Sequence, residues 1–140
     1  MAAPSPKPAE TILVVDDDPE VLSLAVDILR MAGYTVLGTG DPRHVLRLAR
    51  TQAEPLHLLL TDVVMPLMSG LQLAAEVRAI RPEVKILLMS AYRTREIEDY
   101  RTRLAPGEPF LDKPFTVPAL ERAVRAALDY PAPVPRPRAQ

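Results

Sequence analysis

Short apolar runs along the chain alternate with longer stretches in which apolar side chains recur at helical spacing. The first run, at 11–15 (TILVV), has no polar residue in its interior, which is typical of a strand buried on both faces. Similar runs predict strands at 35–39, 56–61, 85–90 and 110–112. Helical spacing predicts five helices, two beginning near 19 and 42 and three spanning about 70–80, 94–103 and 117–129.

Capping residues support the predicted helix starts. Asp18-Pro19 and Asp41-Pro42 each place an aspartate at the N-cap and a proline at the first helical position, and Thr116 is the expected cap of the last helix. Five strands that alternate with five helices predict an α/β fold, in which helices cover both faces of a parallel sheet. Such a doubly wound sheet binds ligands at the carboxyl ends of its strands, where the strand order reverses.

Composition narrows the class of protein. The 140 residues are 48% hydrophobic and 25% charged, which suits one compact domain. There is no cysteine, which excludes disulfides, thiolate zinc sites and thiol catalysis. The net charge of -1 gives no sign of a basic surface for nucleic acid or anionic membrane. No apolar run is long enough to span a bilayer, and the first ten residues lack the apolar core of a secretory signal.

Proline is unusually frequent, with 16 residues. Three lie in 1–10 and four in 131–140, and because proline-rich ends form no helix we expect extended tails at 1–10 and 130–140 around a domain at 11–129. The last ten residues, PAPVPRPRAQ, contain no P-x-x-P spacing, so a linker is favoured over a ligand for SH3-type domains. Only eleven residues follow Asp129, so we expect no output domain there.

Polar side chains stand at the ends of four predicted strands. Asp16 and Asp17 follow the first strand, Asp62 the third and Lys113 the fifth, and Ser90 ends the fourth. The carboxyl ends of parallel strands share one edge, where three carboxylates would repel one another. A hard cation such as Mg²⁺ relieves that repulsion, and the lysine and serine can hold the oxygens of an incoming anion. Phosphoryl transfer to Asp62 is the reaction that fits this set.

Each of these residues has a simpler interpretation when taken alone. The aspartates at 16–18 could be a cap cluster, although that account explains only Asp18 well. Asp62 could be a turn residue, and Lys113 a solvated lysine. The prediction therefore depends on their joint placement at four strand ends.

In four segments the sequence resembles the receiver domain of bacterial two-component response regulators. They are ILVVDDDPEVL (12–22), LLLTDVVMPLMSGL (58–71), ILLMSA (86–91) and FLDKPF (110–115), and the resemblance covers roughly 11–128. It implies a flavodoxin-like five-stranded sheet in the order 2-1-3-4-5. It also implies phosphorelay signalling, in which a histidine kinase or a phosphotransfer domain supplies the phosphoryl group in the bacterial cytoplasm.

The resemblance also implies roles for individual residues. Asp62 would be the phosphoacceptor, and Mg²⁺ would be held by Asp16, Asp17, Asp62 and the backbone carbonyl of Val64. Ser90 would move toward the phosphoryl group.

The remaining implied roles concern Lys113 and the switch. Lys113 would bind the phosphoryl group, and its bond to Pro114 would be cis. Phe110 would be the aromatic switch residue, on an output face that binds a downstream protein or forms a homodimer. Residues 64 and 92 would flank the approach of the water that removes the phosphoryl group, and Val64 and Tyr92 cannot position that water.

Two other functions were weighed against this one. A haloacid-dehalogenase-like phosphatase expects D-x-D-x-[TV] after the first strand, whereas the chain reads DDDPE there. A degenerate module that takes no phosphate conflicts with the full set of site residues. We therefore expect a signalling module rather than an enzyme. The segment 104–110 (LAPGEPF) is more similar to receivers fused to hybrid sensor kinases, so a stand-alone protein and a part of a hybrid kinase both remain open.

Overall fold

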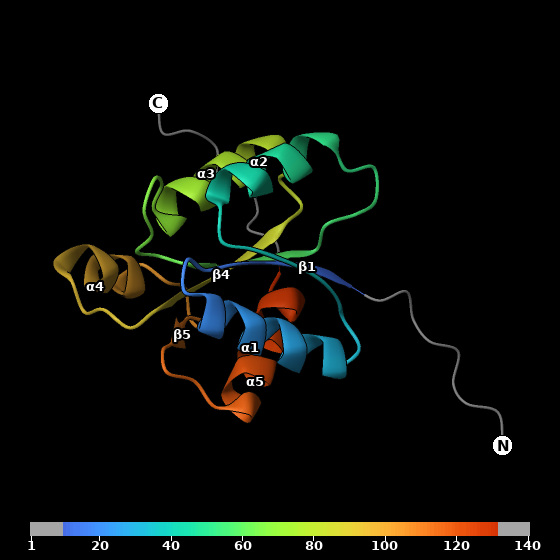
Figure 1. Cartoon of the computed structure of the whole chain (residues 1–140). Coiled ribbons are helices and arrows are strands. Elements are labelled where there is room, and N and C mark those ends of the chain that lie inside the picture. The colour runs from blue at the N-terminus through green and yellow to red at the C-terminus, as the bar shows by residue number, and fades with distance from the viewer. Residues whose placement is uncertain (1–9, 132–140) are drawn as a thin grey trace, which may run out of the picture.

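The computed structural model describes residues 10–131 of the chain. Strands and helices alternate throughout, as Figure 1 shows. In chain order they are β1 (Thr11–Val15), α1 (Pro19–Met31), β2 (Thr35–Thr39), α2 (Pro42–Thr51), β3 (Leu58–Asp62), α3 (Gly70–Ile80), β4 (Lys85–Ser90), α4 (Arg95–Thr102), β5 (Leu111–Asp112) and α5 (Val117–Asp129). None of the helices within residues 10–131 is both long enough and apolar enough to cross a membrane.

The five strands form one parallel sheet in the order β2-β1-β3-β4-β5, which confirms the predicted fold class and strand order. The order reverses between β1 and β3, since the chain first moves outward to β2 and then returns past β1. The carboxyl ends of β1 and β3 therefore lie side by side at the point where a doubly wound sheet binds its ligands.

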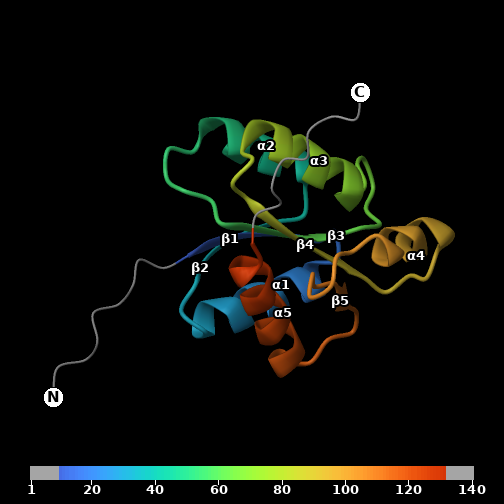
Figure 2. The ribbon, with the colours of Figure 1, turned by 180° about the vertical axis from the view of Figure 1, so that it is seen from behind.

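Helices cover both faces of this sheet. In Figures 1 and 2, α2 and α3 lie over one face and α1 and α5 over the other. Side chains of β1 alternate between the two cores: Ile12 and Val14 pack with α1 and α5, whereas Leu13 and Val15 pack with α2 and α3. The central strands are apolar on both faces for this reason.

The predicted helix caps are present. The side chains of Asp18, Asp41 and Thr116 accept hydrogen bonds from the first backbone N–H groups of α1, α2 and α5. Ser69 and Thr94 cap α3 and α4 in the same way, although neither cap is among those predicted from the sequence. In each of the five helices, the side-chain oxygen of the cap accepts a hydrogen bond from a backbone N–H that has no partner within the helix, which fixes where the helix begins.

Some details differ from the sequence-based expectation, including the fifth strand, which was predicted at 110–112 but begins at Leu111. The third strand was predicted at 56–61 but spans Leu58–Asp62. The residues just before Leu58 belong to the connection from α2, although the N–H of His57 already donates to the carbonyl of Thr11 in β1. Leu24 has the spacing of the apolar stripe of α1 but is half exposed, since Ala25 and Leu29 take the inward positions.

Helix α4 is attached to the domain differently from the other helices. Ile97 is its only buried residue, and in both ribbon views the helix stands at the edge of the sheet beyond β5. Charged side chains supply further links, since Asp112 of β5 pairs with Arg101 of α4 and with Arg93 just before it. These polar contacts add to the packing of Ile97 and Tyr100 against the domain.

One arginine joins the two ends of the described residues. The guanidinium of Arg125 in α5 lies 2.8 Å from a carboxylate oxygen of Glu10 and 2.8 Å from one of Asp129, and it also donates to the hydroxyl of Tyr34. Glu10, predicted to end the first tail, is thereby held against the domain. The tails predicted at 1–10 and 130–140 otherwise lie outside the described residues, apart from Tyr130 and Pro131.

Candidate functional site

Asp16 and Asp62 face each other across the reversal point of the sheet. The register of β1 and β3 pairs Val14 with Leu60 and Val15 with Thr61, so the next residues along each strand are the two aspartates. By the alternation of side chains along a strand, the two aspartates lie on the same face of the sheet as Val14 and Leu60. Both are almost fully buried, with Asp16 1% and Asp62 3% exposed. Burying two carboxylates at adjacent positions is costly unless something compensates their charge.

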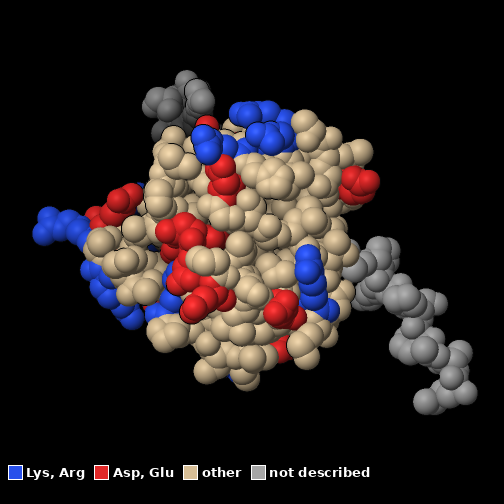
Figure 3. Space-filling model, viewed as in Figure 1, with Lys and Arg blue, Asp and Glu red and all other residues tan. Residues whose placement is uncertain are grey.

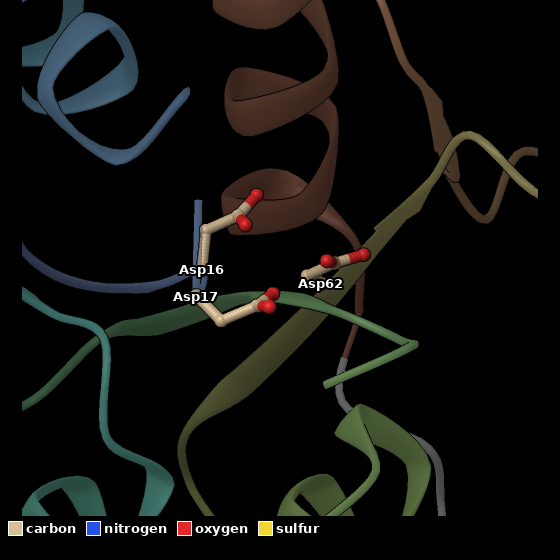
Figure 4. Close-up of side chains that lie close together, drawn as sticks. All are labelled: Asp16, Asp17 and Asp62. Atoms are coloured by element: carbon tan, nitrogen blue, oxygen red, sulfur yellow. The ribbon is translucent and has the colours of Figure 1, made fainter. Parts of the chain in front are cut away.

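Asp17 completes an acidic cluster. One carboxylate oxygen from each of Asp16, Asp17 and Asp62 lies within 4.8 Å of the others, and Figure 4 shows the three side chains converging from β1 and β3. Asp17 is exposed, so the cluster opens to solvent on its side. The predicted meeting of these three carboxylates at one sheet edge is therefore confirmed.

Lys113 supplies the opposing charge. Its ammonium lies 2.9 Å from Asp16 Oδ2 and 3.3 Å from Asp62 Oδ2, and only 12% of its side chain is exposed. The lysine is placed by the backbone of β5, because its N–H donates to the carbonyl of Ser90 at the end of β4. Its bond to Pro114 is cis, as predicted.

The electrostatics of the cluster are reflected in two shifted pKa values. Burial raises the pKa of Asp62, and the attraction of Lys113 only partly opposes that effect, while Asp16 adds to it by repulsion. Burial would lower the pKa of Lys113, but its hydrogen bond to Asp16 and the charge of Asp62 raise the pKa overall. Lys113 is thus protonated at neutral pH, and the negative charge of Asp62 is only partly compensated.

The residues fit a divalent cation. Three carboxylates and one ammonium leave two negative charges, which is the charge that such an ion neutralises. Asp16 Oδ1 accepts from the N–H of Asp18, whereas Asp62 Oδ1 is buried and has no hydrogen-bond partner among the described residues. A buried carboxylate oxygen without a partner is uncommon, and a hard cation is a partner that suits it. The acidic cluster can therefore bind a metal ion.

Ser90 lies on the next strand along. It is buried at the end of β4, and its hydroxyl oxygen accepts the backbone N–H of Tyr92 at 3.0 Å. That contact leaves the hydroxyl hydrogen of Ser90 available to donate. Tyr92 itself is 56% exposed and lies on the rim of the acidic pocket.

The loop after Asp62 is held tightly against it. A Cβ atom on Gly70 would overlap the carbonyl oxygen of Asp62, so only glycine allows α3 to start this close to β3. Between them the N–H of Met68 donates to the carbonyl of Pro66, which closes a three-residue turn around Leu67 with φ at 75°. This φ lies in the left-handed region and is strained for leucine.

Phe110 is half-buried immediately before β5. Its ring packs beside Tyr100, with centroids 6.3 Å apart, and partly against the cluster around Ile97. The guanidinium of Arg101 lies over the ring, 4.6 Å from its centroid. The sequence predicts a role for Phe110 but not for Arg101, since a surface arginine on a charged helix gives no signal of its own.

One open pocket lies over the acidic cluster at the carboxyl edge of the sheet. Figure 3 shows acidic side chains gathered near the middle of this face, with basic side chains over α4 on one side and above them over α2. The pocket is lined by Asp16, Asp17, Asp18, Val21, Asp62, Val64, Ala91, Tyr92, Lys113 and Pro114. Ser90 and Phe110 lie outside this lining, so the structure brings together all the predicted site residues except those two.

A parallel α/β sheet with an acidic pocket at its reversal point defines a doubly wound domain with a candidate cation site at its carboxyl edge. The family model of the response regulator receiver domain matches residues 12–125. The chain is 35% identical over 126 residues to "DNA-binding transcriptional regulator NtrC" of Azospirillum brasilense, which covers 89% of this chain and 25% of that protein. The chain thus spans about a quarter of the length of this curated relative.

Solved structures agree with the sequence comparison. A CheY-like receiver domain protein from Methanospirillum hungatei JF-1 superposes with a TM-score of 0.75 at 26% identity, covering 87% of this chain and 95% of that one. The receiver domain of the hybrid histidine kinase CckA gives a TM-score of 0.70 at 31% identity, covering 85% and 99%.

The chain belongs to the response regulator receiver domain family. Its function is that of a phosphoacceptor receiver in phosphorelay signal transduction, the class that the sequence had indicated. Receiver domains act with histidine kinases and with downstream effector domains, and the fold is consistent with a signalling module.

Proposed function

We propose that Asp62 is the phosphoacceptor of this receiver, and the buried Oδ1 of its carboxylate, which has no hydrogen-bond partner among the described residues, is the observation that supports the assignment. Asp62 lies at the carboxyl end of β3, where the strand order reverses. Burial and Asp16 both oppose its negative charge. Attack of a carboxylate oxygen on phosphorus forms the acyl phosphate, and the electron pair of the bond that breaks leaves with the donor; that bond is P–N for a phosphohistidine and P–O for acetyl phosphate.

Mg²⁺ is the cation proposed for the pocket. Its ligands would be Asp16, Asp17, Asp62 and the backbone carbonyl of Val64, an oxygen-only set of the kind that magnesium prefers over softer metals. When bound, the ion would supply the positive charge that offsets the carboxylates and the phosphoryl oxygens. Asp16 is kept in place for this role by the N–H of Asp18 and by Lys113.

Lys113 and Ser90 are proposed to hold the transferred group. The ammonium already bridges Asp16 and Asp62, so it can shift its hydrogen bonds to a phosphoryl oxygen with little movement. The hydroxyl of Ser90 would donate to another oxygen after the end of β4 moves toward Asp62. Phe110 would then turn inward into the vacated space and change the surface formed by α4, β5 and α5.

That surface is proposed as the site for a downstream protein, with a homodimer as its alternative use. The phosphoryl donor would be a histidine kinase or a phosphotransfer domain, since the chain is similar both to a transcriptional regulator and to a hybrid kinase. We expect a bacterial cytoplasmic location, no direct contact of this domain with nucleic acid or membrane, and no catalysis beyond its own phosphorylation and dephosphorylation.

Treatment with acetyl phosphate and Mg²⁺ tests the assignment of Asp62. The intact mass of the parent protein should increase by one phosphoryl group, and the increase should disappear when the metal is chelated. Asp62→Asn should keep its fold, judged by circular dichroism, and show no increase. Lys113→Ala should bind metal but fail to produce the conformational change, because the hydrogen bond to the phosphoryl oxygen is lost.

Asp27→Asn is the matched control, since it removes an exposed carboxylate from α1 outside the pocket. It should be modified to the same extent as the parent. Modification that persists in Asp62→Asn would show that another residue is the acceptor.

A further inference from the structure

A single arginine contacts both the proposed switch residue and the strand that follows it. The guanidinium of Arg101 lies over the ring of Phe110, 4.6 Å from the centroid, which is within the range of a cation–π interaction. The same guanidinium places Nη1 2.5 Å from Asp112 Oδ1, and Nη2 donates to the other oxygen of that carboxylate. Arg101 therefore cannot follow the ring freely, because Asp112 holds it.

Asp112 is itself fixed by the sheet. It lies in β5, paired with Ser90 of β4, and its carboxylate also lies 3.7 Å from Arg93 in the loop before α4. Arg93 in turn pairs with Glu98 of α4 at 3.3 Å. Asp112 thus links the guanidinium over Phe110 to β5 and its partner β4, and the end of β4 is the part that is proposed to move.

Two other side chains of α4 contribute apolar contacts near Phe110. Ile97 belongs to the buried cluster against which Phe110 packs, and the ring of Tyr100 lies beside that of Phe110, tilted by 50°. A ring that turned inward would keep apolar neighbours but would leave the face of the guanidinium. The contact between Arg101 and the ring therefore contributes interaction free energy in the present position of Phe110 and not in the inward position.

We propose that Arg101 and Asp112 form a latch that holds Phe110 in its present position and so opposes the phosphorylated conformation. Arg101 is a positioning residue that acts through Phe110 and does not touch the acidic pocket. This inference rests on the proposed function, because it requires that Phe110 moves when the pocket is filled. Binding at the pocket and release of the latch are then coupled, and weakening the latch must tighten binding at Asp62.

Beryllofluoride with Mg²⁺, a mimic of the phosphoryl group, provides the test. Binding is followed by fluorine NMR for the parent, Arg101→Gln and Asp112→Asn. Both variants should bind beryllofluoride about twofold to fivefold more tightly, the factor that corresponds to an exposed cation–π contact or ion pair. The double variant should bind no more tightly than Arg101→Gln, because both substitutions open the same latch.

Two further variants distinguish a latch on Phe110 from an arginine that only stabilises the fold. Arg103→Gln removes the same charge from an arginine that donates within α4 to the carbonyl of Asp99, and it should leave beryllofluoride affinity unchanged. In a Phe110→Leu background, Arg101→Gln should lose most of its effect. A merely structural arginine would lower thermal stability without tightening binding.

The outcomes distinguish the two proposals. A parent protein that binds no beryllofluoride would overturn the proposed function and this inference together. A parent that binds, with Arg101→Gln binding equally or more weakly, would overturn the latch alone.

Discussion

The ammonium of Lys113 lies 2.9 Å from Asp16 Oδ2, although 97 residues separate the two in the chain. This contact joins the loop after β5 to the end of β1 and crosses the pocket in doing so. It neutralises only part of the charge there, because Asp17 and Asp62 are brought to the same place. The folded protein therefore contains a concentration of negative charge that unfolding would disperse.

Mg²⁺ should stabilise the folded protein for this reason. At a concentration ten times its dissociation constant we expect an increase in melting temperature on the order of 5 °C, since the ion binds the assembled carboxylates and not the unfolded chain. A thermal scan with and without Mg²⁺ measures the shift. Asp17→Asn should reduce it strongly and Asp27→Asn should not, so equal shifts in all three proteins would contradict the metal assignment.

Leu67 offers a stability prediction that is independent of function. Its φ of 75° is unfavourable for a side chain with a Cβ, and 73% of the residue is exposed, so little packing is lost on its removal. Leu67→Gly should raise the free energy of unfolding by about 0.5–1 kcal/mol, the strain relief exceeding the entropy cost of glycine. Urea denaturation measures the change.

The control for that experiment is Leu67→Ala, which removes most of the same side chain but keeps the strained backbone. It should leave the free energy of unfolding within about 0.5 kcal/mol of the parent. If alanine stabilised the protein as much as glycine, exposed apolar surface rather than backbone strain would be the cause.

The lifetime of the phosphoryl group should be long. Val64 and Tyr92 line the pocket and are 43% and 56% exposed, and neither carries a carboxylate or amide that could position a water molecule for attack. The double variant Val64→Asn/Tyr92→Glu should lose its phosphoryl group roughly tenfold faster or more, because it can orient that water. Decay of the phosphorylated protein at neutral pH, with Mg²⁺ present, gives both rates. Equal rates would show that the side chains at these positions do not limit hydrolysis.

The pairing of Glu10 with Arg125 predicts a pH dependence of stability. The hydrogen bond from Arg125 holds the pKa of Glu10 below its ordinary value, and burial only partly opposes it. A carboxyl whose folded-state pKa is lowered stabilises the protein above its unfolded pKa, and that stabilisation is lost as the pH falls through the folded value. The side chains are about a third and a half exposed, so solvent screening limits the contribution to about 1 kcal/mol or less.

Glu10→Gln tests this pair. It should lower the free energy of unfolding at pH 7, and the difference from the parent should shrink as the pH falls through the lowered folded-state pKa of Glu10, where the parent carboxyl becomes protonated as well. Glu121→Gln, at an exposed position on α5, is the control and should change stability little at either pH. A difference for Glu10→Gln that is the same at pH 7 and at pH 3 would contradict an ionic origin.

Local patterns allowed most of the fold to be predicted. Buried strands, proline-marked helix starts and aspartates at strand ends are features of short segments, and strand order then follows from the family resemblance. Asp16 and Asp62 could be assigned to one edge because parallel strands end together. Contacts between distant side chains gave no such signal: nothing near Arg125 in the sequence indicates Glu10, 115 residues away, and nothing near Arg101 indicates that it covers Phe110.

The same arginine has a practical consequence for engineering. Because Glu10 and Asp129 bind one guanidinium, the two ends of the described domain lie within reach of a short linker, on the far side of the sheet from the carboxyl edge where the acidic pocket opens. Joining them would close the chain into a ring, which could be reopened at the exposed turn 105–107. A circular permutant of this kind would place its new ends close to Phe110 in the chain, where an attached fluorophore would report the proposed turn of that ring.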